Sequence, residues 1–140
     1  NFIVSALQNK TLTIHGDGNS SRDWMYVEDT CQALDKILHV SRDKVIGQVI
    51  NLGTGKDTRV ADIGKKVLEK LGKPETLLEY IEDRPGQVSQ HISSTERSKE
   101  LLDWQARTGL DEGLEKTVEF YKNNRQWWER FIWMKELWGA

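Results

Sequence analysis

The chain has 140 residues, of which 37% are hydrophobic and 30% charged, and its formal net charge is -2. This length fits a single domain spanning residues 1–140, and the composition is that of a folded globular protein rather than a disordered one. The charge argues against a general nucleic-acid binder, which would usually carry a basic excess, but it allows a local basic pocket for a small anion.

In the first part of the chain, the apolar pattern predicts helices and strands in alternation. Residues 2–7 favour a short helix, and residues 11–15 alternate polar and apolar side chains as a half-buried strand does. After a turn containing glycine, residues 24–27 form a second extended run. Residues 28–40 then predict a helix with one buried apolar face, formed by Cys31, Leu34, Ile37 and Leu38.

The remaining elements continue this alternation. Residues 49–52 form a short apolar run before two glycines, which predicts a buried strand, and residues 60–71 predict an amphipathic helix. A strand is expected at residues 77–81 and a helix from residue 93 to about residue 104. The last helix begins near Leu114. Strands that alternate with helices indicate an α/β architecture.

The C-terminal residues 123–140 are rich in tryptophan and favour a helical extension that could be separate from the main domain. Its apolar stripe, at helical spacing, consists of Trp127, Phe131, Met134 and Trp138. These side chains could pack against the body of the domain. They could equally form an interface with a partner, since tryptophan is favoured in binding hot spots.

The single cysteine, Cys31, excludes an intramolecular disulfide, so a reducing cytoplasm is the expected compartment. No apolar stretch reaches the roughly 20 residues of a membrane-spanning helix, and no signal-peptide pattern is visible. The histidines are too few and too dispersed to predict a metal site. We therefore expect a cytoplasmic protein with no nucleic-acid or membrane partner.

The most specific segment of the sequence covers residues 16–29. Its glycines allow a sharp turn, and Arg22 follows directly, where a guanidinium can present a planar fork of donors to a phosphate. The alternative is that Arg22 pairs with a neighbouring carboxylate such as Asp23. Acidic residues at the end of the segment favour the positive end of the helix that follows.

Four segments in this order resemble the NAD-dependent nucleotide-sugar epimerases and dehydratases, the extended short-chain dehydrogenases. They are residues 16–29, Gly47-Gln48-Val49-Ile50-Asn51-Leu52-Gly53, Asp83-Arg84-Pro85-Gly86 and residues 113–121. The resemblance runs from about residue 2 to residue 128, and within the family it is closest to the dTDP-glucose 4,6-dehydratases. It implies that the chain is the small C-terminal substrate-binding portion of such an enzyme, α/β in class and without the N-terminal Rossmann half.

The resemblance also implies roles for individual residues. Arg22 and Arg84 would contact the phosphates of a nucleoside-diphosphate sugar, and Asn51 would hydrogen-bond the ligand near them. Ile14 and His15 match the strand that lines the nucleotide base in the family.

His91 is also expected at the substrate site, although the closest dehydratases tend to carry tyrosine there. The residue types also allow other roles for two of these side chains. Asn51 lies in an apolar run, where a polar side chain needs partners, and it could satisfy the local backbone at a strand end. Arg84 precedes Pro85 and Gly86 and could simply belong to a turn. The identities of the nucleotide base and the sugar stay open.

The catalytic motifs of the family are absent from this sequence. A Gly-x-x-Gly-x-x-Gly turn would bind NAD, and a Tyr-x-x-x-Lys pair would transfer protons. We therefore expect NAD in the full-length parent enzymes but no cofactor and no catalysis in this chain alone. The alternative is a non-catalytic oligomerisation or interaction module derived from the family. In either case, apolar surface left uncovered by the missing half favours a homo-oligomer.

Overall fold

The computed structural model describes residues 1–132 and has the expected α/β character. The elements, in chain order, are α1 (Phe2–Leu7), β1 (Leu12–His15), β2 (Ser21–Asp23), α2 (Val27–His39), α3 (Arg42–Val45), β3 (Asp57–Arg59), α4 (Val60–Lys70), the 3₁₀ helix η1 (Glu75–Leu77), β4 (Leu78–Ile81), β5 (Gln90–His91), α5 (Glu96–Leu102), α6 (Leu110–Asn123) and α7 (Arg125–Glu129). Among these described helices, none is both long enough and apolar enough to cross a membrane.

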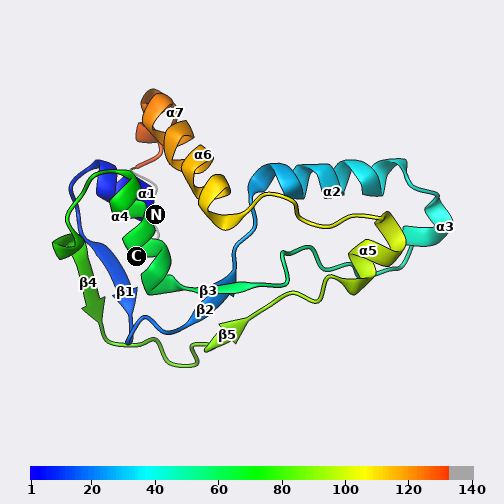
Figure 1. Ribbon diagram of the computed structural model, residues 1–140, viewed down its shortest axis with the longest axis horizontal. Coiled ribbons are helices and arrows are strands. Elements are labelled where there is room, and N and C mark those ends of the chain that lie inside the picture. Colours follow the sequence, from blue (N-terminus) through cyan, green and yellow to red (C-terminus); the bar gives the residue numbers. More distant parts are fainter. Residues whose placement is uncertain (133–140) are drawn as a thin grey trace.

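Two small sheets organise the chain (Figure 1). β1 and β4 form a parallel pair in which Leu12 lies opposite Leu78. The second sheet has the order β3-β2-β5, and its central strand β2 runs antiparallel to β3 and parallel to β5. β2 therefore joins segments that are widely separated in the sequence.

The larger core lies between α1, β1, α4 and α6. Alternation along β1 turns Leu12 and Ile14 inward, where they are 0% and 1% exposed. From α4, Val67 and Leu68 meet this strand at helical spacing and are also fully buried, and α6 contributes Val118. Apolar residues thus recur at every second position in the strand and at every third or fourth position in the helix. This is why the predicted strand at 11–15 and the predicted helix at 60–71 both form.

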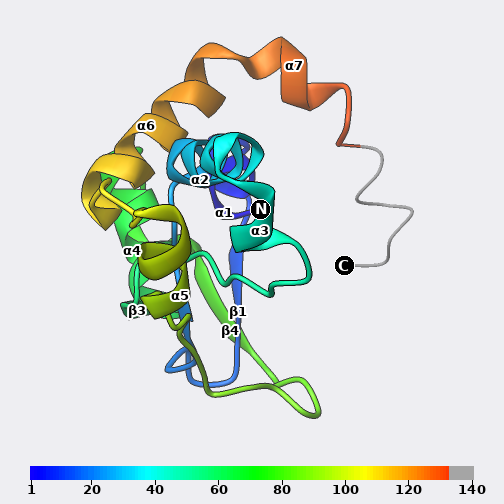
Figure 2. The same cartoon turned by 90° about the vertical axis from the view of Figure 1, so that its right-hand side faces the viewer.

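A smaller core lies at the other end of the molecule, where α2 faces α5 (Figure 2). Ala33 of α2 packs there with Leu102 and Trp104. Lys36 adds a polar contact, since its Nζ donates to the carbonyl oxygens of Leu102 at 3.2 Å and Asp103 at 3.1 Å. A cation at this position satisfies carbonyls left open at the end of α5.

The helix predicted at 28–40 forms as α2, but its predicted buried face is right only for Ile37, which packs against the smaller core, and wrong for Cys31, Leu34 and Leu38. Its buried residues are Asp29 and Ala33, whereas Leu34 is 50% and Leu38 is 80% exposed. Asp29 is buried because its Oδ2 accepts a hydrogen bond from the backbone N–H of Thr108 at 2.9 Å. The helix thus has two apolar sides, and only one of them meets the small core.

The uncovered side of α2 is an apolar stripe. Its residues follow one another at steps of four, three and four, which places them on one face of a helix: Val27, Cys31, Leu34 and Leu38. All four are exposed within the described part of the chain. We refer to these four residues as the α2 stripe.

Two further expectations differ from the structure: the extended run at residues 24–27 is not the strand of this region, and the predicted strand at residues 49–52 is wrong. The strand near the glycine turn is Ser21–Asp23 rather than residues 24–27, because β3 and β5 offer partners only to Ser21, Arg22 and Asp23. Residues 49–52 form no strand, and Val49 is 74% exposed. A strand needs a neighbour for its backbone groups, and no described strand lies in register with this run.

The predicted last helix is interrupted at Asn124, where α6 ends and the short α7 begins. Trp128 packs α7 against α6. This residue is 4% exposed, and its Nε1 donates to the carbonyl oxygen of Tyr121 at 2.8 Å. Trp127 and Phe131 stay about half exposed. The remaining members of the predicted stripe, Met134 and Trp138, lie outside the described residues.

A pair of leucine substitutions tests this distribution of burial. Leu68→Ala should lower the free energy of unfolding by about 2–5 kcal/mol, because it removes buried methyl groups and leaves a cavity. Leu38→Ala, at the exposed end of the α2 stripe, should change it by less than about 0.5 kcal/mol. Urea unfolding of both variants measures the difference, and equal losses would contradict the described cores.

Candidate functional site

A polar hollow of about 370 Å³ lies beside the three-stranded sheet. Its lining residues come from three separate segments: Arg22, Asp23, Asn51, His91, Ile92 and Ser93. Arg22 of β2 and His91 of β5 are register partners in the parallel pair. Their side chains therefore project from the same face of the sheet, and the fold brings together three of the predicted substrate-binding residues.

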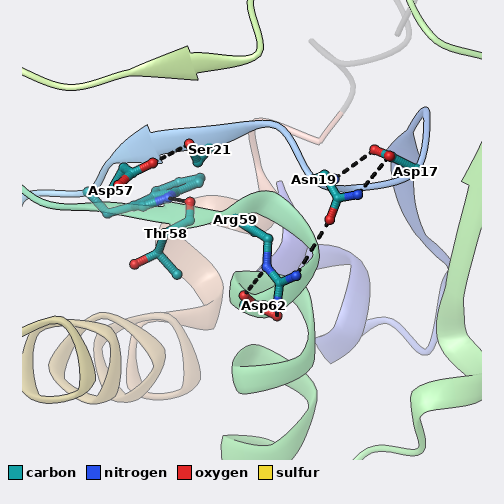
Figure 3. A network of polar contacts seen from close by, with 8 residues as sticks. Asp17, Asn19, Ser21, Asp57, Thr58, Arg59 and Asp62 are labelled. Carbon is teal, nitrogen blue, oxygen red and sulfur yellow. Dashed lines mark hydrogen bonds and ion pairs between the residues drawn. The ribbon is translucent and has the colours of Figure 1, made fainter.

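The turn before β2 is fixed by a polar network (Figure 3). Asp17 accepts hydrogen bonds from the backbone N–H of Asn19 at 2.9 Å and from its side-chain amide at 2.7 Å. Arg59 donates to both carboxylate oxygens of Asp62, at 2.8 and 3.2 Å, and contacts Asn19 Oδ1 at 3.5 Å. Gly18 has a φ of 75°, which other residues rarely adopt. Together these features hold the turn against the start of α4.

Asp57 of β3 ties the same sheet together outside the hollow. Its carboxylate accepts from the Ser21 hydroxyl (Figure 3) and from Gln90 Nε2 at 2.9 Å. The bond from Ser21, followed by the bond from Gln90, lowers the pKa of Asp57 below its usual range. One side chain thus links all three strands.

Arg22 is anchored by backbone carbonyls rather than by a carboxylate. Its Nη1 donates to the carbonyl oxygens of Ser21 at 2.6 Å and Val88 at 2.9 Å. Within residues 1–132 it forms no ion pair, so the alternative interpretation of an Arg22–Asp23 pair is wrong. Nε and Nη2 have no hydrogen-bond partner among the same residues and keep their N–H groups available to an anion.

Asp23 accepts hydrogen bonds from two other segments. Its Oδ1 accepts from the backbone N–H of Thr54 at 2.9 Å and from the Thr54 hydroxyl at 2.6 Å. Its Oδ2 accepts from the backbone N–H groups of Thr54 at 3.1 Å, Gly55 at 3.0 Å and Ser93 at 3.3 Å. Partial burial alone would raise the pKa of Asp23, but the bonds from Thr54, Gly55 and Ser93 outweigh it and lower the pKa.

Gly53 allows these segments to approach so closely. A Cβ atom at this position would meet the side chain of Ser93 and would lie 2.5 Å from Asp23 Oδ2. Both distances are far below van der Waals contact, so any larger residue would push the loop away from the carboxylate. Gly53 is therefore required by packing against Asp23.

Asn51 and His91 present their side chains at the mouth of the hollow. Both are exposed. Asn51 makes no side-chain hydrogen bond to any described residue, so the alternative role as a cap for the local backbone does not apply in this fold. Its amide keeps both donors and acceptor for a ligand.

The other predicted site residues lie outside the hollow. Ile14 is 1% exposed, so its side chain belongs to the protein interior. His15 is half-buried at the end of β1, where its Nδ1 lies 3.3 Å from the carbonyl oxygen of Glu82. Arg84 is exposed on the loop between β4 and β5 and does not line the hollow. Its loop nevertheless contacts Arg22, because Val88 supplies one of the accepting carbonyls.

A larger groove of about 790 Å³ lies elsewhere, between α1, the start of α2, α4 and α6. Its walls are mostly apolar and include Phe2, Val60, Val67, Leu114 and Tyr121. Phosphate binding needs cationic or N–H donors, so the smaller polar hollow is the better candidate for an anionic ligand despite its size. Among residues 1–132, no group of three or more metal-ligating side chains is found.

The sequence did not single out Thr54, Ser93 or the carboxylate role of Asp23. A useful signal was present, because Asp23 follows the candidate phosphate-binding arginine and a Gly-Thr-Gly sequence follows Asn51. Glycines beside a short hydroxyl residue are typical of a loop whose backbone N–H groups face an acceptor. The partner acceptor, however, lies 31 residues away from Thr54.

Comparisons with known proteins give the ancestry of the chain. The family model for GDP-mannose 4,6 dehydratase matches residues 1–117. The trifunctional UDP-glucose 4,6-dehydratase/UDP-4-keto-6-deoxy-D-glucose 3,5-epimerase/UDP-4-keto-L-rhamnose-reductase of Arabidopsis thaliana is 37% identical over 128 residues. That match covers 91% of this chain and 19% of the Arabidopsis protein.

Solved structures agree with this relationship. The dTDP-glucose 4,6-dehydratase of Bacillus anthracis, in complex with NAD, matches with a TM-score of 0.81 and 32% identity, over 92% of this chain and 40% of that chain. The UDP-glucose 4-epimerase of Thermotoga maritima, with UDP-glucose, matches with a TM-score of 0.79 and 31% identity, over 89% and 38%. The chain spans less than half the length of each of these relatives. It belongs to the family of nucleotide-sugar dehydratases and epimerases that the GDP-mannose 4,6 dehydratase model describes.

Proposed function

We propose that this chain is the nucleotide-sugar-binding portion, corresponding to the C-terminal part, of an NAD-dependent sugar-nucleotide 4,6-dehydratase or epimerase. The observation that carries the proposal is the convergence of Arg22, Asn51 and His91 on one polar hollow. A guanidinium with two open nitrogens, an unpartnered amide and an exposed imidazole suit the oxygens of a diphosphate. The dTDP-glucose 4,6-dehydratases serve as the model for the substrate in this proposal.

In this proposal the diphosphate contacts Nε and Nη2 of Arg22, and Asn51 orients it by hydrogen bonding. Arg84 would reach the ligand by a movement of its loop, which already contacts Arg22 through Val88. His15 would serve the nucleotide base, and Ile14 would support that wall from the interior.

The chemistry belongs to the rest of a family-length enzyme. The Bacillus anthracis relative binds NAD, and this chain lacks the glycine turn and the Tyr-x-x-x-Lys pair that such enzymes use. We assign NAD binding, and the oxidation and elimination or epimerisation steps, to the complementary portion. The α2 stripe and the exposed Val49 support this division, because both are apolar and uncovered among the described residues.

The second candidate, an interaction module, is favoured by a different surface. Phe120, Trp127 and Phe131 are 46%, 48% and 42% exposed, and their rings contact one another with centroids 5.5 and 6.1 Å apart. A cluster of exposed aromatic rings of this kind is typical of interfaces. Such a module would self-associate through α6 and α7 instead of the α2 stripe.

Ligand binding tests the first candidate directly. dTDP-glucose or UDP-glucose at 100 times its Kd should stabilise the chain by about 2.7 kcal/mol and raise its Tm by several degrees. Arg22→Ala should weaken binding at least about tenfold, since hydrogen bonds to charged groups contribute about 1.5–3 kcal/mol. Arg22→Lys should fall between the two, because it keeps the charge but loses the fork.

The matched control for that series is Arg42→Ala, which removes an exposed arginine of α3 at the far end of the molecule (Figure 1). It should bind as the unaltered chain does. The absence of any Tm rise with either nucleotide-sugar would overturn the proposal, as would equal rises for the unaltered chain and Arg22→Ala.

Self-association separates the two candidates. The double substitution Leu34→Glu/Leu38→Glu should shift the isolated chain toward monomer in sedimentation velocity, because it places charges on the α2 stripe. Both positions are exposed, so folding should be little affected. Trp127→Ser is the comparison, and a shift to monomer with this variant alone would favour the interaction module.

A further inference from the structure

The carboxylate of Asp23 is the unexpected member of the hollow. Arg22, Asn51 and His91 suit an anionic ligand, but Asp23 places a negative charge among them. By Coulomb repulsion alone, a carboxylate beside a diphosphate weakens its binding. A residue that opposes the ligand in this way needs a compensating role.

The hydrogen bonds of Asp23 indicate that role. They reach Thr54 and Gly55 in one segment and Ser93 in another. Each segment carries a candidate ligand-binding side chain a short distance away, since Asn51 lies three residues before Thr54 and His91 lies two residues before Ser93.

The Asn51 segment is held from two sides. Away from the sheet, Ile50 and Leu52 pack against the smaller core, and Arg97 Nη1 donates to the Val49 carbonyl oxygen at 3.3 Å. Residues 49–52 belong to no strand, and Gly53 packs directly against Asp23 and Ser93. On the side that faces the sheet, the bonds from Thr54 and Gly55 to the Asp23 carboxylate fix the distance between this loop and β2. His91 has a second support, because β5 pairs with β2.

We infer that Asp23 is a positioning residue, whose carboxylate sets the distances between Arg22, Asn51 and His91 by binding Thr54, Gly55 and Ser93. This inference rests on the proposed function for its ligand, a nucleoside diphosphate. The same bonds explain how the hollow accommodates the negative charge of Asp23, since four N–H and O–H donors stabilise this carboxylate.

Electrostatics and positioning predict opposite results for Asp23→Asn. Loss of the negative charge alone would tighten the binding of a diphosphate. Loss of positioning would weaken it, because an amide keeps one accepting oxygen but replaces the other with an NH₂ group that cannot accept from Gly55 or Ser93. We expect the second result, with binding at least tenfold weaker.

The experiment is calorimetric titration of dTDP into the unaltered chain, Asp23→Asn, Thr54→Val and Asp57→Asn, below the Tm of each variant. Thr54→Val removes the hydroxyl bond to Asp23 and the contacts of that hydroxyl with the Lys56 backbone, but it keeps the N–H bonds to Asp23. It should therefore weaken binding by a smaller factor and still fold. Asp57→Asn is the matched charge control, since Asp57 is the register partner of Asp23 but lies outside the hollow. It should weaken dTDP binding less than Asp23→Asn does, because the bonds of Asp57 reach Ser21 and Gln90 rather than the Asn51 loop.

Equal or tighter binding by Asp23→Asn would overturn the inference. An equal loss of dTDP affinity in Asp57→Asn would overturn it too, since the effect would then follow from weakening any polar contact in the sheet. If the unaltered chain binds no dTDP, the proposed function fails, and NMR decides the positioning role separately. Asp23→Asn should then shift the side-chain signals of Asn51 and His91 more than Asp57→Asn does, and unchanged signals would refute it.

Discussion

The backbone pairing of β2 is the interaction on which the rest of this structure depends. The strand has three residues, yet it pairs with β3 on one side and β5 on the other. Those two ladders connect the larger core, with its helices α1, α4 and α6, to the smaller core between α2 and α5 (Figure 1). The candidate site lies along this connection, so its geometry depends on how well β2 is held.

Polar contacts strengthen that short connection at each residue. Ser21 is bonded to Asp57, Arg22 is anchored on the Val88 carbonyl, and Asp23 binds the Thr54 loop. A two- or three-stranded sheet of this size has little stability of its own. Side-chain hydrogen bonds across the strands therefore stabilise this sheet, whereas a larger sheet would be stabilised by its backbone hydrogen bonds and its buried apolar faces.

The contrast between the two hollows also bears on function. The apolar groove is the larger, but the side chains suited to an anion line the smaller polar hollow. Apolar walls suit contact with other protein surface, whereas unpartnered guanidinium and amide groups suit a ligand. The polar hollow is thus the candidate surface for a charged ligand, and the apolar groove is a candidate for protein contacts.

Sequence periodicity predicts the long elements well, because α2, α4 and α6 each bury at least one side at helical spacing. It fails for strands of two or three residues, where no period can be measured and the available partner decides which residues pair. It also fails for the α2 stripe, since the sequence shows that a face is apolar but not what covers it.

The residues of the candidate site were likewise predictable from the sequence only in part. Arg22, Asn51 and His91 were predicted from residue type and family resemblance, and the fold brings them to one hollow. Arg84 was predicted on the same grounds and lies outside it. The role of Asp23 depends on the approach of Thr54 and Ser93 through space, which no local pattern records.

The unpaired run at residues 48–52 has a consequence for the behaviour of the protein at high concentration. Five uncharged residues, Gln48-Val49-Ile50-Asn51-Leu52, combine β-branched side chains with the absence of proline and glycine. Short segments of this composition stack readily into intermolecular cross-β assemblies when their backbone groups are open. In the folded chain Ile50 and Leu52 pack against the smaller core, so opening of that core is the step that would expose the segment to such assembly.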